Sequence, residues 1–185
     1  MAADDASPRP IDANHLRVPR PVLVVFLSWL AMVGVDLFLH AGLLAPLYDW
    51  DSPFVLPPEQ AVVRIPAGYV SLLLLAIVLV WVLPLLRVRR GGEGALFAAA
   101  GAAVVSGAFL IGLWSISTAE AALLAAWWLG QTAQLALGGY IVGASLAGDR
   151  PGRLLAVAAT AVVLGAVSAV VLQSSGYAEA PVMIR

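Results

Sequence analysis

Two ionisable side chains lie within a long apolar run near the start of the chain. Asp36 and His40 are one helical turn apart, so a helix would present both on the same face. Counting back from Pro46 at ~1.5 Å per residue places Asp36 roughly 15 Å, and His40 roughly 9 Å, from the outer end of that run. A carboxylate at this depth must be protonated, partnered or hydrated, because a charge in hydrocarbon is costly. This pair is therefore the first candidate site.

A later apolar run supplies amide and indole side chains at helical spacing. They follow a 4-3-4 pattern and so form one stripe on a helix: Trp127, Gln131, Gln134 and Gly138. Gln131 lies roughly 16 Å from the start of this run at Glu120, a depth that matches that of Asp36. We therefore expect the two helices to pack with Asp36, Gln131 and His40 in one hydrogen-bonded cluster. Gln134 would lie one turn deeper.

Three roles are open to such a cluster. In the first, interhelical hydrogen bonds worth about 0.6 kcal/mol each on average fix the register of the helices. In the second, the cluster is a proton-responsive or ligand-responsive site in a cavity that opens outward. In the third, it is catalytic. A water-sized cavity that reaches Asp36 would favour the second role, and a dry, fully hydrogen-bonded Asp36 would favour the first.

The residue types argue against the catalytic role. The chain has no cysteine, and all ten of its basic residues are arginine, which excludes thiol nucleophiles and Schiff-base lysines. Asp36 is the single deep carboxylate, whereas an intramembrane aspartyl protease needs two. Ser28 and Ser106 are not placed to reach His40 as a nucleophile would have to. We therefore expect a protein that is not an enzyme and holds no cofactor.

The sequence also predicts no metal site. Two histidines, His15 and His40, cannot build a multi-histidine zinc or haem site within one chain. The acidic residues Asp49, Asp51 and Glu59 are of a type that binds a divalent cation weakly. We interpret them instead as a solvated loop.

The composition sets the class of protein. Of the 185 residues, 62% are hydrophobic and 11% are charged, whereas a soluble domain is about half apolar and a quarter charged. So few charges could not cover a surface in water, which leaves a small multi-pass membrane protein with the lipid bilayer as its first partner. The formal net charge of −1, with basic residues dispersed over loops, predicts no nucleic-acid partner.

Five stretches are long enough to cross ~30 Å of hydrocarbon as helices. They cover about residues 21–46, 67–86, 94–114, 121–147 and 154–173. None alternates between apolar and polar residues as a barrel strand does, so helices must satisfy their backbone groups in lipid. The predicted fold class is all-α, an integral membrane bundle of five transmembrane helices.

The arginines predict the orientation of this bundle. Eight fall on the N-terminal tail and on the second-to-third and fourth-to-fifth connections: Arg9, Arg17, Arg20, Arg87, Arg89, Arg90, Arg150 and Arg153. The opposite side has Arg64 and Arg185. Because basic residues concentrate on the cytoplasmic side, we expect a cytoplasmic N-terminus in a cell membrane.

The segments outside the spans divide the chain further. Residues 1–20, with prolines and mixed charge, are expected to be a disordered cytoplasmic tail before a five-helix domain at 21–173. An outer loop at 49–66 is expected to contain one or two interfacial helical turns from Pro58. Residues 174–185 are expected to be irregular.

Rows of small residues predict where the helices approach closely. Gly139 and Gly143 form one such row, and Ala161 and Gly165 another, each at four-residue spacing. Small residues at this spacing let helix backbones come together in lipid. The rows predict close packing but do not separate a seam inside the bundle from a contact with a second copy.

Two segments carry a resemblance to known proteins. The first is the end of the first span, Leu-Leu-Ala-Pro-Leu-Tyr at 43–48, and the second is Trp-Leu-Gly-Gln at 128–131 leading to Gly138, Gly139 and Gly143. Both resemble small multi-pass membrane proteins of bacteria and archaea that are grouped as domains of unknown function. The resemblance implies a bundle of about four helices and no particular activity.

Two functional hypotheses follow. The leading one is a structural or accessory membrane protein whose buried polar cluster sets helix register. The alternative is a small-solute or proton-linked transporter, or a membrane sensor, that uses Asp36, His40, Gln131 and Gln134. Either would be compatible with a homo-oligomer or with another membrane protein as partner.

Overall fold

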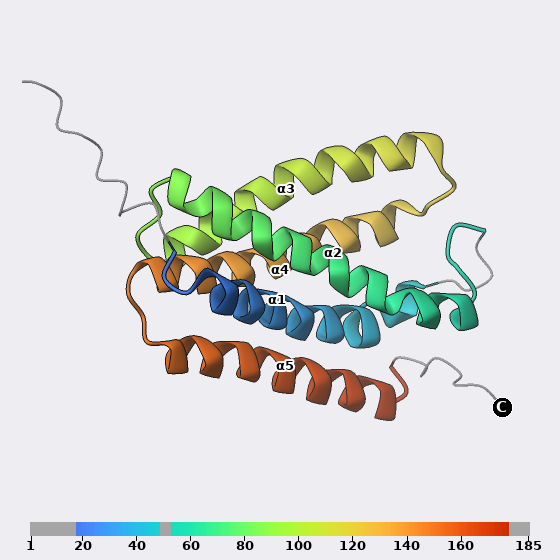
Figure 1. Ribbon diagram of the computed structural model, residues 1–185. Coiled ribbons are helices and arrows are strands. Elements are labelled where there is room, and N and C mark those ends of the chain that lie inside the picture. Colours follow the sequence, from blue (N-terminus) through green and yellow to red (C-terminus); the bar gives the residue numbers. More distant parts are fainter. Residues whose placement is uncertain (1–17, 49–52, 178–185) are drawn as a thin grey trace, which may run out of the picture.

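The computed structural model describes residues 18–48 and 53–177, which form five long α-helices (Figure 1). These are α1 (Pro21–Phe38), α2 (Pro58–Leu85), α3 (Gly91–Ile116), α4 (Ala121–Leu146) and α5 (Pro151–Ser174). A π-helix and a 3-10 helix follow α1: η2 (Leu39–Leu43) and η3 (Ala45–Leu47). No strand occurs in the two described ranges, and the all-α prediction is confirmed.

Four helices are long and apolar enough to cross a membrane: Pro21–Leu43, Gln60–Leu85, Gly91–Ile116 and Pro151–Ser174. Their length and composition are those of a multi-pass membrane protein. The remaining predicted span, 121–147, forms α4, which is not among the four. Gln131, Thr132 and Gln134 lower the mean hydropathy of α4. This helix also has more buried residues than any other described helix. It therefore packs mainly against protein.

The helices lie side by side, with α1 in contact with α2, α4 and α5 (Figure 1). Helices α3 and α4 form an antiparallel pair with extensive contact. The α2–α3 and α4–α5 connections lie at one end of the bundle, and the α3–α4 connection lies at the other (Figure 1). The core is formed by fully buried side chains of α1, α2 and α4: Leu27, Met32, Leu83, Ile141 and Val142.

The outer faces of three helices are strongly apolar. Large hydrophobic side chains are exposed along α2, α3 and α5, among them Val70, Trp81, Val104, Phe109, Val163 and Val170. A soluble protein does not expose continuous apolar faces of this extent, because water disfavours them. These faces therefore support contact with a lipid bilayer.

Helix α2 starts at Pro58, where we expected interfacial helical turns to begin. We expected those turns to be separate from the span at 67–86, but α2 passes through Pro66 and joins the two. Pro58 at the first helical position has no backbone N–H that would need a partner. Pro66 deprives the Val62 carbonyl of a helical donor, and both residues are exposed, so no unpaired group is sealed in the core.

Parts of the predicted tails and loop fall outside the described residues. This applies to 1–17 of the tail predicted at 1–20, to 49–52 of the loop predicted at 49–66, and to 178–185 of the C-terminal segment predicted at 174–185. Of that last segment, Ser174 is still the final residue of α5, and Ser175–Tyr177 form a turn after it.

Both rows of small residues lie at close helix contacts within the chain. A Cβ atom at Gly143 would lie 2.5 Å from the Arg90 carbonyl oxygen, and one at Gly139 would overlap the Gly94 carbonyl oxygen, so this row forms the α3–α4 seam. Helices α1 and α5 meet at a second seam, where a Cβ at Gly34 would lie 2.6 Å from the Ala161 carbonyl oxygen. A Cβ at Gly165 would overlap the Gly34 carbonyl oxygen. The expectation of a homo-oligomer or a membrane-protein partner stays a prediction.

Candidate functional site

The end of the first span is not regular α-helix. From Leu39 the chain continues as η2, in which the Leu44 amide donates to the Leu39 carbonyl at 2.7 Å, and then turns through η3. π-Helical turns are rare and occur frequently at functional sites. Here the turn carries His40, and η3 brings Tyr48 back beside it.

Two residues at and just after the end of α5 donate hydrogen bonds to carbonyl groups of η2. The Gln173 side-chain amide donates to the Ala41 carbonyl oxygen at 2.7 Å, and the Tyr177 hydroxyl donates to the Leu43 carbonyl oxygen at 3.3 Å. An irregular helix leaves carbonyls without their usual donors, which is costly at membrane depth unless other groups pair them. The end of α5 therefore holds η2 in place.

A continuous polar contact chain joins α1, η2, the turn after η3 and α4. The Gln134 amide nitrogen Nε2 donates to Asp36 Oδ1 at 2.8 Å, and His40 Nε2 lies 3.6 Å from the same oxygen. The second distance is too long for a hydrogen bond, and it makes an ion pair when His40 is protonated. On its other side, His40 Nδ1 shares a hydrogen bond with the Tyr48 hydroxyl, to which Trp127 Nε1 donates at 3.0 Å.

This arrangement bears on the tautomer of His40. The indole N–H of Trp127 can only donate, so the Tyr48 oxygen is its acceptor. When Tyr48 donates its own hydroxyl hydrogen to His40 Nδ1, neutral His40 carries its hydrogen on Nε2, on the side of Asp36. The ring is thereby oriented between a phenol and a carboxylate.

Two oxygens of the cluster accept no hydrogen bond from the described residues. Gln134 is fully buried. Among the side-chain oxygen and nitrogen atoms of residues 18–48 and 53–177, its Oε1 is the one buried atom that lacks a hydrogen-bond partner. Asp36 Oδ2 also has no donor among these residues but is not sealed. The carboxylate therefore has one oxygen held by Gln134 and one that is open to an occupant.

A cavity of about 650 Å³ adjoins the carboxylate. Its walls come from α1, η2, α2 and the turn after α5, and the polar residues that line it are Asp36, His40, Tyr48, Tyr69 and Tyr177. The side chains of Asp36 and His40 are 23% and 32% exposed, although both residues belong to the candidate span Pro21–Leu43. The cavity thus brings open space to ionisable groups within a candidate membrane span.

The position of Gln131 differs from what we expected. Gln131 is half-buried and makes no hydrogen bond within the described ranges, whereas Gln134 donates to Asp36. The expected match of Asp36 with Gln131 assumed a regular α-helix from Asp36 to Pro46. Because η2 and η3 interrupt that helix, the rise per residue is not uniform between Asp36 and Pro46. Asp36 therefore lies beside Gln134, which is three residues, or about 4.5 Å, further along α4 than Gln131.

Sequence reasoning missed the tyrosines and Gln173. The return of Tyr48 to His40 depends on the η2–η3 turn, which no periodicity signals. Tyr69 and Tyr177 come from two other elements and meet only in the folded bundle. The polar residue Gln173 at the end of an apolar run was the available signal.

Burial raises the pKa of Tyr48 to about 12 from its usual value of 10.0, and the nearby Asp36 carboxylate adds to this effect against the Trp127 hydrogen bond. The phenol therefore holds its proton more tightly in the folded than in the unfolded chain. Its contribution to stability is complete below about pH 10 and is lost as the pH rises from about 10 to 12. We expect thermal unfolding over this range to show a steeper loss of stability for the parent protein than for Tyr48→Phe; parallel curves would contradict this assignment.

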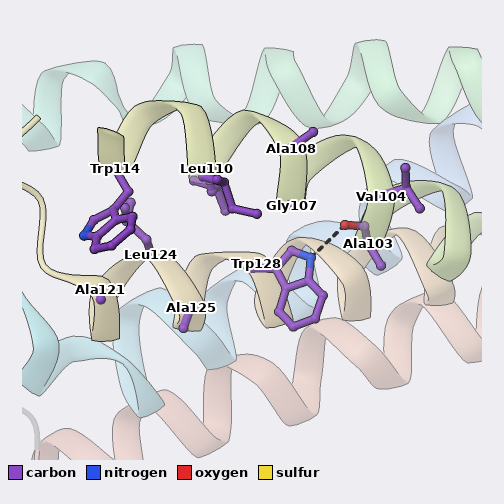
Figure 2. A pocket seen from close by; sticks show the side chains of 11 residues that line it. Ala103, Val104, Gly107, Ala108, Leu110, Trp114, Ala121, Leu124, Ala125 and Trp128 are labelled. Carbon is purple, nitrogen blue, oxygen red and sulfur yellow. Dashed lines mark hydrogen bonds between the residues drawn. The ribbon is translucent and has the colours of Figure 1, made fainter. Parts of the chain in front are cut away.

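A second hollow, between α3 and α4, is apolar. It has a volume of about 550 Å³, and Trp114, Leu110 and Leu124 lie along it (Figure 2). The Trp128 indole N–H donates to the Ala103 carbonyl oxygen across the two helices at 2.8 Å (Figure 2). None of its lining residues is ionisable, so this hollow offers no acid, base or charge and does not belong to the polar site.

Comparison of the chain with known protein families, with curated proteins and with solved structures finds no match. The resemblance to small multi-pass membrane proteins therefore has support from the four apolar helices alone. Within the described residues, no group of three or more His, Cys, Asp or Glu side chains gathers in a way that could hold a metal ion. What these observations identify is a multi-pass membrane protein with a polar cluster beside a cavity.

Proposed function

We propose that the protein is not an enzyme and binds a small solute in the cavity beside Asp36, as a transporter or a membrane sensor does. One observation carries the proposal: Asp36 Oδ2 accepts no hydrogen bond from the described residues and is not buried, next to a cavity of about 650 Å³ within a candidate membrane span. Ionisable groups at membrane depth are costly and mark sites of binding or proton transfer more often than chance.

A purely structural role for the cluster is less well supported. Hydrogen bonds that only fix helix register work best when both partners are fully satisfied and dry. Here one carboxylate oxygen and the Gln134 Oε1 atom find no donor in residues 18–48 and 53–177, and the Asp36 side chain is 23% exposed. A binding site explains the open carboxylate, whereas a register-setting bond would not require a cavity.

The proposed topology has five spans, with α4 as the fifth. Helix α4 runs antiparallel to α3 and has the same number of residues, which supports its crossing with α3 (Figure 1). Six described arginines lie near the end with the α2–α3 and α4–α5 connections: Arg20, Arg87, Arg89, Arg90, Arg150 and Arg153. Arg64 lies near the start of α2, away from the α2–α3 connection. The positive-inside rule then supports a cytoplasmic N-terminus and a cavity on the outer side of the cell membrane.

The test uses the absence of native cysteine. Ala41 lines the cavity within the candidate span, so a membrane-impermeant maleimide added to intact cells is expected to label Ala41→Cys. Ala100→Cys on α3 is the matched control, because Ala100 is exposed on an apolar outer face within a candidate span and should stay unlabelled. Labelling is measured by a mass shift of the purified protein.

Each other outcome contradicts a defined part of the proposal. If Ala41→Cys reacts only after the cells are made permeable, the orientation is wrong but the cavity is accessible. If Ala41→Cys stays unlabelled under both conditions in folded protein, water does not reach the cluster and the binding function is wrong. If Ala100→Cys is labelled as strongly as Ala41→Cys, the outer face of α3 does not face lipid.

A further inference from the structure

The open oxygen of Asp36 defines what the cavity can recognise. Because Gln134 already donates to Oδ1 and His40 lies near that same atom, Oδ2 is the oxygen left for an occupant. A carboxylate oxygen accepts hydrogen bonds and does not donate them when ionised. The matching ligand group is therefore a donor, and a cationic donor forms the stronger, charge-assisted bond.

The walls of the cavity favour a cation over an anion. Asp36 is the carboxylate among the lining residues, and none of those residues is an arginine. Three tyrosines, Tyr48, Tyr69 and Tyr177, contribute aromatic side chains to the same walls. Aromatic rings attract cations through their negative faces, and this attraction strengthens where water is scarce. An anion would instead meet the carboxylate, and the one lining side chain that can carry a positive charge, His40, already lies 3.6 Å from Asp36 Oδ1.

A metal ion is less suited to this site than an organic cation. The described residues offer no group of three metal-ligating side chains, and Asp36 with His40 supplies two. The remaining walls are apolar, among them Leu37, Val62 and Ile65. Such walls match the hydrocarbon part of an organic ligand, and the volume lies within the ordinary range for small-molecule sites.

We infer that the ligand is a small protonated amine, whose ammonium N–H donates to Asp36 Oδ2 while its apolar part lies against the tyrosines and the aliphatic wall. This inference rests on the proposed binding function and names its ligand class. It needs no chemical step, because the amine is bound and released unchanged.

The experiment compares three probes of similar size and different charge. Benzylammonium, benzyl alcohol and benzoate are titrated by calorimetry into the full chain reconstituted in phosphatidylcholine nanodiscs, with empty nanodiscs as the blank. Benzylammonium is expected to bind at least about tenfold more tightly than benzyl alcohol, since a charge-assisted hydrogen bond is lost in the alcohol. Benzoate is expected to show no binding.

Two variants connect the selectivity to Asp36. Asp36→Asn keeps an oxygen for the Gln134 hydrogen bond but removes the charge, so benzylammonium affinity should fall at least about tenfold. Asp149→Asn is the control, because Asp149 is a carboxylate at the other end of the bundle that pairs with Arg153 at 3.2 Å. Its binding is expected to match that of the parent, and thermal unfolding verifies that both variants fold.

The inference and the proposed function fail in different ways. Equal affinity for the amine and the alcohol, preference for benzoate, or unchanged affinity in Asp36→Asn would overturn the amine as ligand. If no probe binds while Ala41→Cys is labelled, the ligand class is wrong and the accessible cavity stands. If Ala41→Cys is not labelled, the proposed function fails whatever the probes do.

Discussion

Gly165→Ala is expected to lower the stability of the bundle, whereas Gly101→Ala, the same change on α3, is expected to raise it. A Cβ atom at Gly165 would overlap the backbone oxygen of Gly34, and a backbone atom cannot move aside without separating α1 from α5. We expect a loss of about 3 kcal/mol, toward the upper part of the range for overpacked interiors. At Gly101 nothing lies within 4 Å of the new methyl group. There alanine gains about 0.5–1 kcal/mol from its higher helix propensity.

The two variants form a matched pair, because each adds one methyl group within a helix that is a candidate span. Equilibrium unfolding in mixed micelles, followed by helical circular dichroism, measures the change in the free energy of unfolding for each. Changes of opposite sign in the free energy of unfolding support the close α1–α5 contact. A change of the same sign and size in both variants would show that α1 and α5 do not meet at this distance.

Asp36→Leu is expected to destabilise the protein by about 2 kcal/mol and to abolish solute binding. The substitution leaves Gln134, which is fully buried, without a partner on Nε2 as well as on Oε1. A buried donor that loses its partner costs about 1–3 kcal/mol. Asp36→Asn is expected to keep most of the stability, because its side-chain oxygen can still accept from Gln134.

A second substitution separates this mechanism from general misfolding. Replacing both hydrogen-bonding partners by apolar groups is nearly neutral, so Asp36→Leu with Gln134→Leu should recover most of the lost stability without recovering binding. The coupling free energy from the four proteins of the double-mutant cycle is the measured quantity. Additive losses of stability would mean that the contribution of Gln134 to stability does not depend on Asp36, and that the hydrogen bond between them does not stabilise the protein.

Much of the fold could be predicted because it follows from periodicity and composition. The apolar runs locate the helices to within several residues for four of the five, since lipid requires unbroken helical hydrogen bonding over the width of the membrane. The interfacial turns from Pro58 and the span at 67–86 were predicted as separate because proline usually ends a helix, and Pro66 does not. The α4 segment forms a helix as expected, but its polarity leaves it outside the four candidate spans.

The candidate site was harder to predict because it depends on how the elements meet. The spacing of Asp36 and His40 placed them on one face, and the polar stripe on α4 was visible in the sequence. Which glutamine meets Asp36 depended on the irregular turn after Phe38, which changes the axial alignment of α1 and α4. The contribution of Tyr48 depended on the same turn.

The hydrogen bond between Asp36 and Gln134 has a consequence for how the chain is made. The two residues are 98 positions apart, so the ribosome completes α1 long before it adds the side chain that pairs with the carboxylate. Tyr177, which lines the same cavity, follows later still. During that interval the first helix carries an ionisable group that hydrocarbon disfavours. Until α4 arrives, Asp36 therefore has to be protonated, hydrated or paired with another group such as His40, and assembly of the cavity is a late step of biogenesis.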